Sequence, residues 1–281
     1  MKASTERILT THVGSLPRSE ALLDMLTAME AGREIDRERF RIQVREEMAE
    51  VVRKQADCGI DSAGDGELPR IGFSIYAKNR MAGFDGLSNR GTITDFAKFP
   101  QYAAFLSKRA GFDITTSATI YDMPQCVRAV QYDPDMQQAR EELDLFKEVL
   151  DSESDAAAKF TETFVTAATP GILSTTLLRD PDNPDYSSDE EYVYGLAAEM
   201  KKEYDYIASR GHVIQLDAPD LALERQILYR DRPLSEFLER VELHIDAMNR
   251  AIADIPKEQL RLHVCWGNWE GPHIDDIALE P

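Results

Sequence analysis

The sequence predicts an α/β fold, in which a parallel β-sheet is covered by helices. Short apolar runs alternate along the chain with long amphipathic stretches, and this β-α-β-α order is typical of such a sheet. The apolar runs have the composition expected of strands that are buried on both faces. The length of 281 residues suits one large domain, since α/β barrels often contain about 250 residues.

Five apolar runs are predicted to form the strands. The first is rich in β-branched residues and is stopped by Gly14, Ser15 and Pro17. The second leads into the turn Gly64-Asp65-Gly66, and the third ends at Thr169-Pro170-Gly171. In chain order the predicted strands are Ile8–Val13, Ile60–Ala63, Phe164–Ala168, His212–Leu216 and Leu260–Val264.

Three long helices are predicted between these strands, at about 36–57, 188–210 and 232–252. The first has apolar residues at helical spacing and is followed by Gly59, a plausible C-cap. The second carries three acidic residues, 189–191, in its first turn, where the helix dipole favours anions. The third has Pro233 near its N1 position.

The stretch from about residue 83 to residue 163 interrupts this alternation. It is rich in aromatic residues and contains one further strand candidate, Cys126–Gln131. We expect it to be an insertion over the mouth of the barrel, within a single domain that comprises residues 1–281.

The charge of the chain excludes two classes of partner. With 32 Lys and Arg against 51 Asp and Glu, the formal net charge is −19, which disfavours binding to nucleic acid or to anionic membranes. No apolar run reaches the roughly 18 residues of a membrane span. Three scattered cysteines and an amino terminus without an apolar signal segment predict a reduced, cytoplasmic setting.

His263 and Cys265 form the sharpest motif in the sequence. Residues two apart in a strand point to the same face, so the imidazole and the thiolate are both expected to face inward. Zn²⁺ accepts this nitrogen and sulfur pair, and usually has about four tetrahedral ligands. The alternative is a buried cysteine beside a hydrogen-bonded core histidine. Further metal-capable groups, each interpreted as structural or solvated, are His12, His273, Asp275 and Asp276.

Other strand ends carry polar residues, as in barrel enzymes, whose sites lie at the carboxyl ends of the strands. Glu67 is suited to bind an amine or to act as an acid or base, or it is a solvated turn residue. Asp217 ends an apolar strand, where an unpaired carboxylate is costly, so we expect it to have a binding role. The alternative is that it caps the following turn. Gly14 lets backbone N–H groups approach a ligand carboxylate, and Ser15 either joins that site or caps a helix that begins near Arg18.

Four segments resemble the cobalamin-independent methionine synthase family, most closely its short single-barrel branch with the epoxyalkane:coenzyme M transferase-like proteins. They are 10–18 (TTHVGSLPR), 65–67 (DGE), 215–219 (QLDAP) and 263–268 (HVCWGN). The resemblance implies a TIM-type (β/α)₈ barrel and a zinc-dependent thiol methyl or alkyl transferase. The simplest such reaction methylates homocysteine to methionine, with 5-methyltetrahydrofolate or another methyl donor.

The resemblance also assigns roles to six residues. It implies that His263 and Cys265 are zinc ligands. It implies that Gly14, Ser15 and Glu67 hold the carboxylate and the amine of homocysteine, and that Asp217 contacts the same amine.

The chain departs from the family at its carboxyl end. The family's other zinc ligands, an acidic residue and a cysteine, come from later strands, whereas this sequence stops at Pro281 after about five barrel strands. We therefore expect an incomplete, C-terminally truncated barrel, assembled as a homo-oligomer or with a complementary carboxyl-terminal partner chain. The alternative functions are alkyl transfer to another thiol such as coenzyme M, a catalytically silent or split-enzyme subunit, and tetrapyrrole decarboxylation on the same barrel. For a sulfonate thiol, Arg18 or Arg70 would serve.

Overall fold

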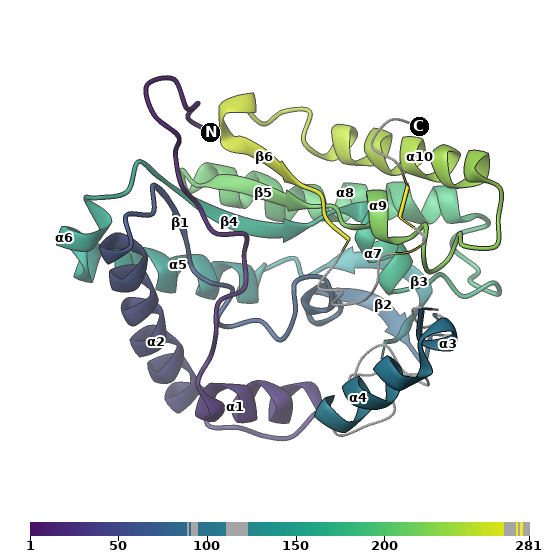
Figure 1. Cartoon of the computed structure of the whole chain (residues 1–281), viewed down its shortest axis with the longest axis horizontal. Coiled ribbons are helices and arrows are strands. Elements are labelled where there is room, and N and C mark those ends of the chain that lie inside the picture. The colour runs from purple at the N-terminus through teal and green to yellow at the C-terminus, as the bar shows by residue number, and fades with distance from the viewer. Residues whose placement is uncertain (89, 91–94, 111–122, 267–273, 275, 278–281) are drawn as a thin grey trace.

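In the computed structural model, a four-stranded parallel sheet lies at the centre of the fold (Figure 1). The structure describes residues 1–88, 90, 95–110, 123–266, 274, 276 and 277. The strands are β1 (Ser62–Gly64), β4 (Glu162–Ala168), β5 (Val213–Asp217) and β6 (Leu260–His263), in the order β1-β4-β5-β6. The predicted α/β fold with a parallel sheet is confirmed, whereas closure into an eight-stranded barrel stays a prediction.

The two faces of this sheet differ in chemistry, because side chains alternate along each strand. Four outer positions of β4 and β5 are apolar and at most 2% exposed: Val165, Ala167, Ile214 and Leu216. On the inner face the strand register aligns Thr166 with Gln215, and Gln215 with Arg261. The sheet therefore turns a polar surface inward, and this surface positions the candidate site.

The helices begin and end within two residues of their predicted bounds. α2 (Arg37–Asp57) follows the N-cap Asp36, whose carboxylate accepts a hydrogen bond from Arg39 N at 3.0 Å. α8 (Asp189–Ser209) follows the N-cap Ser188 in the same way. α10 (Leu234–Ala251) begins directly after Pro233, which takes the N-cap position rather than N1.

The predicted strand at Ile8–Val13 is wrong. Thr11 makes a single parallel bridge to Ser62, but the neighbouring N–H of Thr10 donates to the carboxylate of Asp61 at 2.8 Å. Arg7 forms an ion pair with the same carboxylate. Because Asp61 takes the donor that a neighbouring strand would need, the described sheet has four strands rather than the expected five.

Between β1 and β4 the chain builds a second, antiparallel sheet from β2 (Met81–Asp85) and β3 (Gln125–Tyr132). The strand predicted at 126–131 lies within β3, and Cys126 N donates to Leu178 O at 2.8 Å, just beyond α7 (Pro170–Thr176). The elements η1 (Ile75–Asn79), α3 (Asp95–Lys98) and α4 (Pro100–Ala110) flank this sheet in sequence.

The chain then returns to the main sheet through α5 (Gln137–Ser152) and α6 (Ser154–Ala157). α5 packs against α2, and Glu148 of α5 pairs with Arg45 of α2 at 2.7 Å. The 83–163 stretch thus contains a helix of the outer layer as well as most of the second sheet. The remaining elements are α1 (Glu20–Glu30), α9 (Asp220–Leu223) and η2 (Lys257–Gln259). Among the described residues we find no helix with the length and apolar character that a membrane crossing requires.

Candidate functional site

The loop after β1 holds Glu67 in an unusual backbone conformation. Its φ is 54°, in the left-handed region that non-glycine residues seldom occupy. Asp65 Oδ1 accepts the N–H of Glu67 at 2.9 Å. The guanidinium of Arg18 donates to the carbonyls of Glu67, Leu68 and Arg70. These contacts fix the loop, and Glu67 is 1% exposed.

Gly14 and Ser15 both adjoin the Glu67 carboxylate. Ser15 Oγ donates to Glu67 Oε2 at 2.6 Å. A Cβ on Gly14 would collide with Glu67 Oε1, so glycine is required for this approach. The cap of α1 is Ser19, whose Oγ accepts from Leu22 N at 3.2 Å. The alternative of Ser15 as the helix cap is therefore wrong.

Asp217 ends β5 on the inner face and is 5% exposed. Gln215 Nε2 donates to Asp217 Oδ1 at 2.8 Å, and this is the carboxylate's one hydrogen bond among the described residues. It therefore does not cap the following turn. Burial raises the pKa of Asp217 to about 7, and the negative charge of Glu67 adds to this, against the opposing effect of Gln215.

Thr166 and Arg261 belong to the same surface but were not among the predicted site residues. Thr166 is 1% exposed, and its Oγ1 has no hydrogen-bond partner among the described residues. Arg261 donates to Gln215 Oε1 at 2.5 Å and to Thr11 Oγ1 at 3.0 Å, and its guanidinium lies 3.5 Å from the centre of the Phe164 ring. Both residues could have been found from the alternation within their strands, because every second residue of a strand faces the same side of the sheet.

His263 and Cys265 lie on the continuation of this face. His263 is the register partner of Asp217. The side chains of His263 and Cys265 are partly buried. Burial and the charge of Arg261 lower the pKa of His263, which favours the neutral imidazole that metals bind. The described residues contain no set of three His, Cys, Asp or Glu side chains that could hold a metal ion. A histidine and a cysteine would supply two of the four ligands of a tetrahedral zinc site, and His273 and Asp275 lie outside the described residues.

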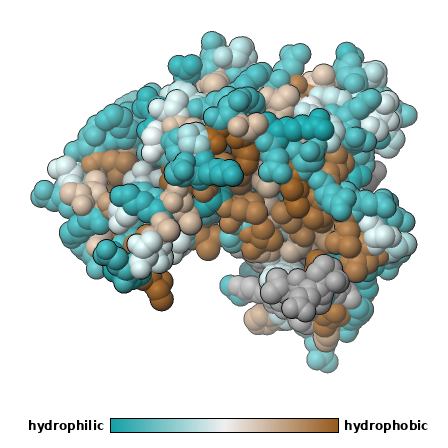
Figure 2. Space-filling model, turned by 90° about the horizontal axis from the view of Figure 1, so that it is seen from above, coloured by the Kyte–Doolittle hydropathy of each residue, from teal (hydrophilic) through white to brown (hydrophobic). Residues whose placement is uncertain are grey.

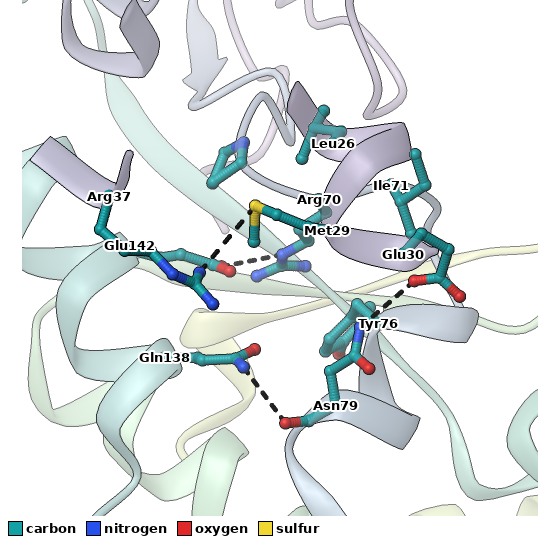
Figure 3. A pocket seen from close by; sticks show the side chains of 11 residues that line it. Leu26, Met29, Glu30, Arg37, Arg70, Ile71, Tyr76, Asn79, Gln138 and Glu142 are labelled. Carbon is teal, nitrogen blue, oxygen red and sulfur yellow. Dashed lines mark hydrogen bonds and ion pairs between the residues drawn. The ribbon is translucent and has the colours of Figure 1, made fainter. Parts of the chain in front are cut away.

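Arg70 connects the loop after β1 to β4 and to the helices. It donates to Thr166 O at 2.7 Å and to Glu142 Oε2 at 2.9 Å, and its guanidinium lies 4.5 Å from the centre of the Tyr76 ring. Figure 3 shows Arg70 and Glu142 facing each other in the wall of a cavity of about 220 Å³. Both Arg70 and Arg18 are thus engaged by partners within the protein.

Two methionine synthases are similar to this chain in sequence. That of Thermococcus kodakarensis is 27% identical over 273 residues, and that of Sulfolobus acidocaldarius is 23% identical over 275 residues. A solved B12-independent methionine synthase from Shewanella sp. W3-18-1, in complex with selenomethionine, superposes with a TM-score of 0.57 at 19% identity, over 92% of this chain. The chain is a homologue of these methionine synthases in sequence and shares the fold of the B12-independent ones.

The homology covers most of this chain and part of each relative. The match takes in 96% of this chain and 66% of each of the two sequence relatives, so the chain spans about two thirds of their length. It spans 61% of the Shewanella structure. A putative vitamin-B12-independent methionine synthase from Listeria monocytogenes gives a TM-score of 0.53 at 16% identity, over 94% of this chain and 68% of its own. No family model matches the chain.

The main sheet therefore has the fold of a methionine synthase barrel domain. Within it, the structure brings Gly14, Ser15 and Glu67 into direct contact. Asp217 and His263 are neighbours across β5 and β6, and Cys265 follows His263 by two residues.

Proposed function

We propose that the chain carries the substrate-binding part of a zinc-dependent thiol methyltransferase, which acts on homocysteine. The observation that carries this proposal is the pair of buried carboxylates, Glu67 and Asp217, on one polar face. Two carboxylates in a buried space call for a cationic partner. The ammonium group of an amino-acid thiol supplies that cation.

The alternative of a sulfonate thiol such as coenzyme M is less well supported. A sulfonate needs a cation that is free to bind it, and the two arginines considered for this role are Arg18 and Arg70. Arg18 is engaged by four backbone carbonyls, and Arg70 by Glu142 and Thr166 O. Arg261, on the same face, is engaged by Gln215. The amino-acid thiol is therefore the better fit to this face.

In the proposed reaction, Glu67 and Asp217 hold the substrate ammonium, while Ser15 orients the Glu67 carboxylate. His263 and Cys265 would hold zinc, which when bound lowers the pKa of a substrate thiol. The further zinc ligands come from outside the described residues or from a complementary partner chain. The methyl donor is 5-methyltetrahydrofolate or another methyl compound, and a reducing compartment such as the cytoplasm keeps the thiols free of disulfides.

Ligand binding and metal content together test this proposal. By calorimetry we expect the chain to bind L-homocysteine in preference to 2-mercaptoethanesulfonate, and Glu67→Gln to weaken homocysteine binding by about 10-fold or more, since a hydrogen bond to a charged group is lost. The exposed Glu20→Gln is the matched control. Preference for the sulfonate, or homocysteine binding unchanged in Glu67→Gln, contradicts the proposed substrate.

Elemental analysis tests the metal separately. We expect about one zinc per chain, lost in Cys265→Ser and kept in Cys58→Ser, because Cys58 is exposed and lies at the end of α2. Homocysteine binding without zinc would mean that the metal site needs further residues or a partner. Such a chain would be one part of a split enzyme.

A further inference from the structure

We propose that Thr166 is the third acceptor for the ammonium group of the substrate, and that it selects for an unsubstituted primary amine. This inference rests on the function proposed above, because it takes the ligand of this face to be an amino acid. It adds a specificity-determining residue from β4 to the carboxylates that follow β1 and end β5.

The hydroxyl of Thr166 is a buried polar group. The residue is 1% exposed, and Oγ1 has no hydrogen-bond partner among the residues that the structure describes. Buried polar groups are nearly always hydrogen-bonded, so a buried hydroxyl that lacks a partner points to a ligand or a solvent molecule. The residue is also fixed in place, because Arg70 Nη1 holds its carbonyl at 2.7 Å.

The position of Thr166 relates it to both carboxylates. Thr166 Oγ1 lies 3.5 Å from the point that a Cβ of Gly14 would occupy, and Glu67 Oε1 borders the same point. In the register of the sheet, Thr166 is aligned with Gln215. Gln215 in turn donates to Asp217 at 2.8 Å. Thr166 therefore lies on the inner face between the loop after β1 and the end of β5.

The hydrogen bonds of the two carboxylates leave one oxygen on each without a partner among the described residues. Ser15 occupies Glu67 Oε2 and Gln215 occupies Asp217 Oδ1. Glu67 Oε1, Asp217 Oδ2 and Thr166 Oγ1 remain as acceptors. A primary ammonium group has three N–H donors, so three acceptors match it in number. The third is neutral, so it satisfies the last donor without burying another charge.

This arrangement predicts selectivity at the nitrogen. Removal of the amino group leaves Glu67 Oε1, Asp217 Oδ2 and Thr166 Oγ1 without the N–H donors that would satisfy them, which is costly in a buried site. A methyl group on the nitrogen replaces one N–H and leaves one acceptor unpaired. Threonine suits this role because its branched Cβ restricts χ1, so the oxygen is held in few orientations.

Calorimetry with three probes tests the assignment: L-methionine, N-methyl-L-methionine and 4-(methylthio)butanoate, which lacks the amine. Wild type is expected to prefer L-methionine. We expect Thr166→Val to weaken L-methionine binding about 10-fold, as for the loss of one hydrogen bond to a charged group, and to leave the desamino probe within about twofold. Thr166→Ser should retain most of the affinity, and the control Thr163→Val, on the opposite face of β4, should leave the selectivity unchanged.

Each outcome separates this inference from the function on which it rests. If wild type prefers the amine-bearing probe and Thr166→Val keeps that preference in full, Thr166 is not the third acceptor and the proposed substrate class stands. If Thr166→Val weakens the binding of L-methionine and of the desamino probe equally, the assignment is also overturned, because the hydroxyl would then contact a part of the ligand other than its amine. If wild type does not distinguish the two probes, the ammonium site itself is wrong, and both proposals fail.

Discussion

At the scale of single residues, Asp217 makes stability depend on pH. Burial raises its pKa to about 7 in the folded protein, against about 3.9 in an unfolded chain. The folded state holds the proton more tightly, so the contribution of Asp217 to stability is complete below about pH 4 and is lost as the pH rises through about 7. Asp217→Asn removes this loss, and we expect it to be more stable than wild type by up to about 4 kcal/mol near pH 8.

Urea unfolding of the two proteins near pH 4 and near pH 8 measures this effect. The difference in unfolding free energy should be small at the lower pH and large at the higher one. The exposed Asp24→Asn serves as the control and should show no such divergence. A difference that is the same at both pH values would mean that Asp217 is charged in the folded protein at neutral pH.

The site residues were predictable where chemistry and position agree. Glu67 and Asp217 stand at strand ends, and the structure places both on the polar side of the sheet. Thr166 was not predictable in this way, because a threonine within a β-branched run is read as a good strand former. Thr166 and Glu67 can lie close together only because Gly14 between them has no side chain, and Gly14 is more than 100 residues from Thr166 in sequence. Likewise, Ser15 and Ser19 are both plausible caps, and only the hydrogen bond to Leu22 N distinguishes them.

At the scale of elements, His212 couples the start of β5 to α5 and has the opposite pH response. Its ring stacks on that of Phe146, with 5.3 Å between the ring centroids, and its Nδ1 lies 2.8 Å from Thr163 Oγ1. Burial, with a smaller effect of Arg210, lowers its pKa to about 4. Because the folded pKa lies below the unfolded value of about 6.5, its contribution is complete above that pH and is lost as the pH falls through about 4.

His212→Phe keeps an aromatic ring against Phe146 and removes the titration. We expect it to cost about 1 kcal/mol at neutral pH, because the hydrogen bond to Thr163 is lost. Its stability should then fall less than that of wild type between about pH 6.5 and pH 4, by up to about 3 kcal/mol. Thermal unfolding across this range measures both effects. Equal losses on acidification would show that His212 does not titrate abnormally.

The elements were predictable where their signals are local. Asp36 and Ser188 cap the helices that follow them, and both helices begin where the sequence indicated. The strand at Ile8–Val13 failed for a non-local reason, since the carboxylate of Asp61 takes the N–H of Thr10. β-propensity reports a side chain's suitability for a sheet, but the ladder also needs a free donor.

At the scale of the whole molecule, the helical layer covers the sheet unevenly. Leu216 of β5 and Leu262 of β6 are register partners on the outer face, yet Leu216 is 2% exposed and Leu262 is 50% exposed. Val264 beyond it is also exposed. β6 and α10 lie at the top of Figure 1. Figure 2 shows the molecule from above, and a broad hydrophobic area is visible on this side. The described part of the fold therefore leaves the outer face of its last strand without a helix.

The two leucines provide a matched test of this arrangement. If the face of β6 is open in solution, Leu262→Gln should change the unfolding free energy by no more than about 0.5 kcal/mol, as is usual for an exposed site. Leu216→Gln should cost roughly 2–5 kcal/mol, because it removes a buried side chain and introduces a polar one. An equally large loss for Leu262→Gln would mean that β6 is covered. A change in mass by light scattering would then identify the cover as a second copy of the chain, whereas an unchanged monomer mass would assign it to residues outside the described part of this chain.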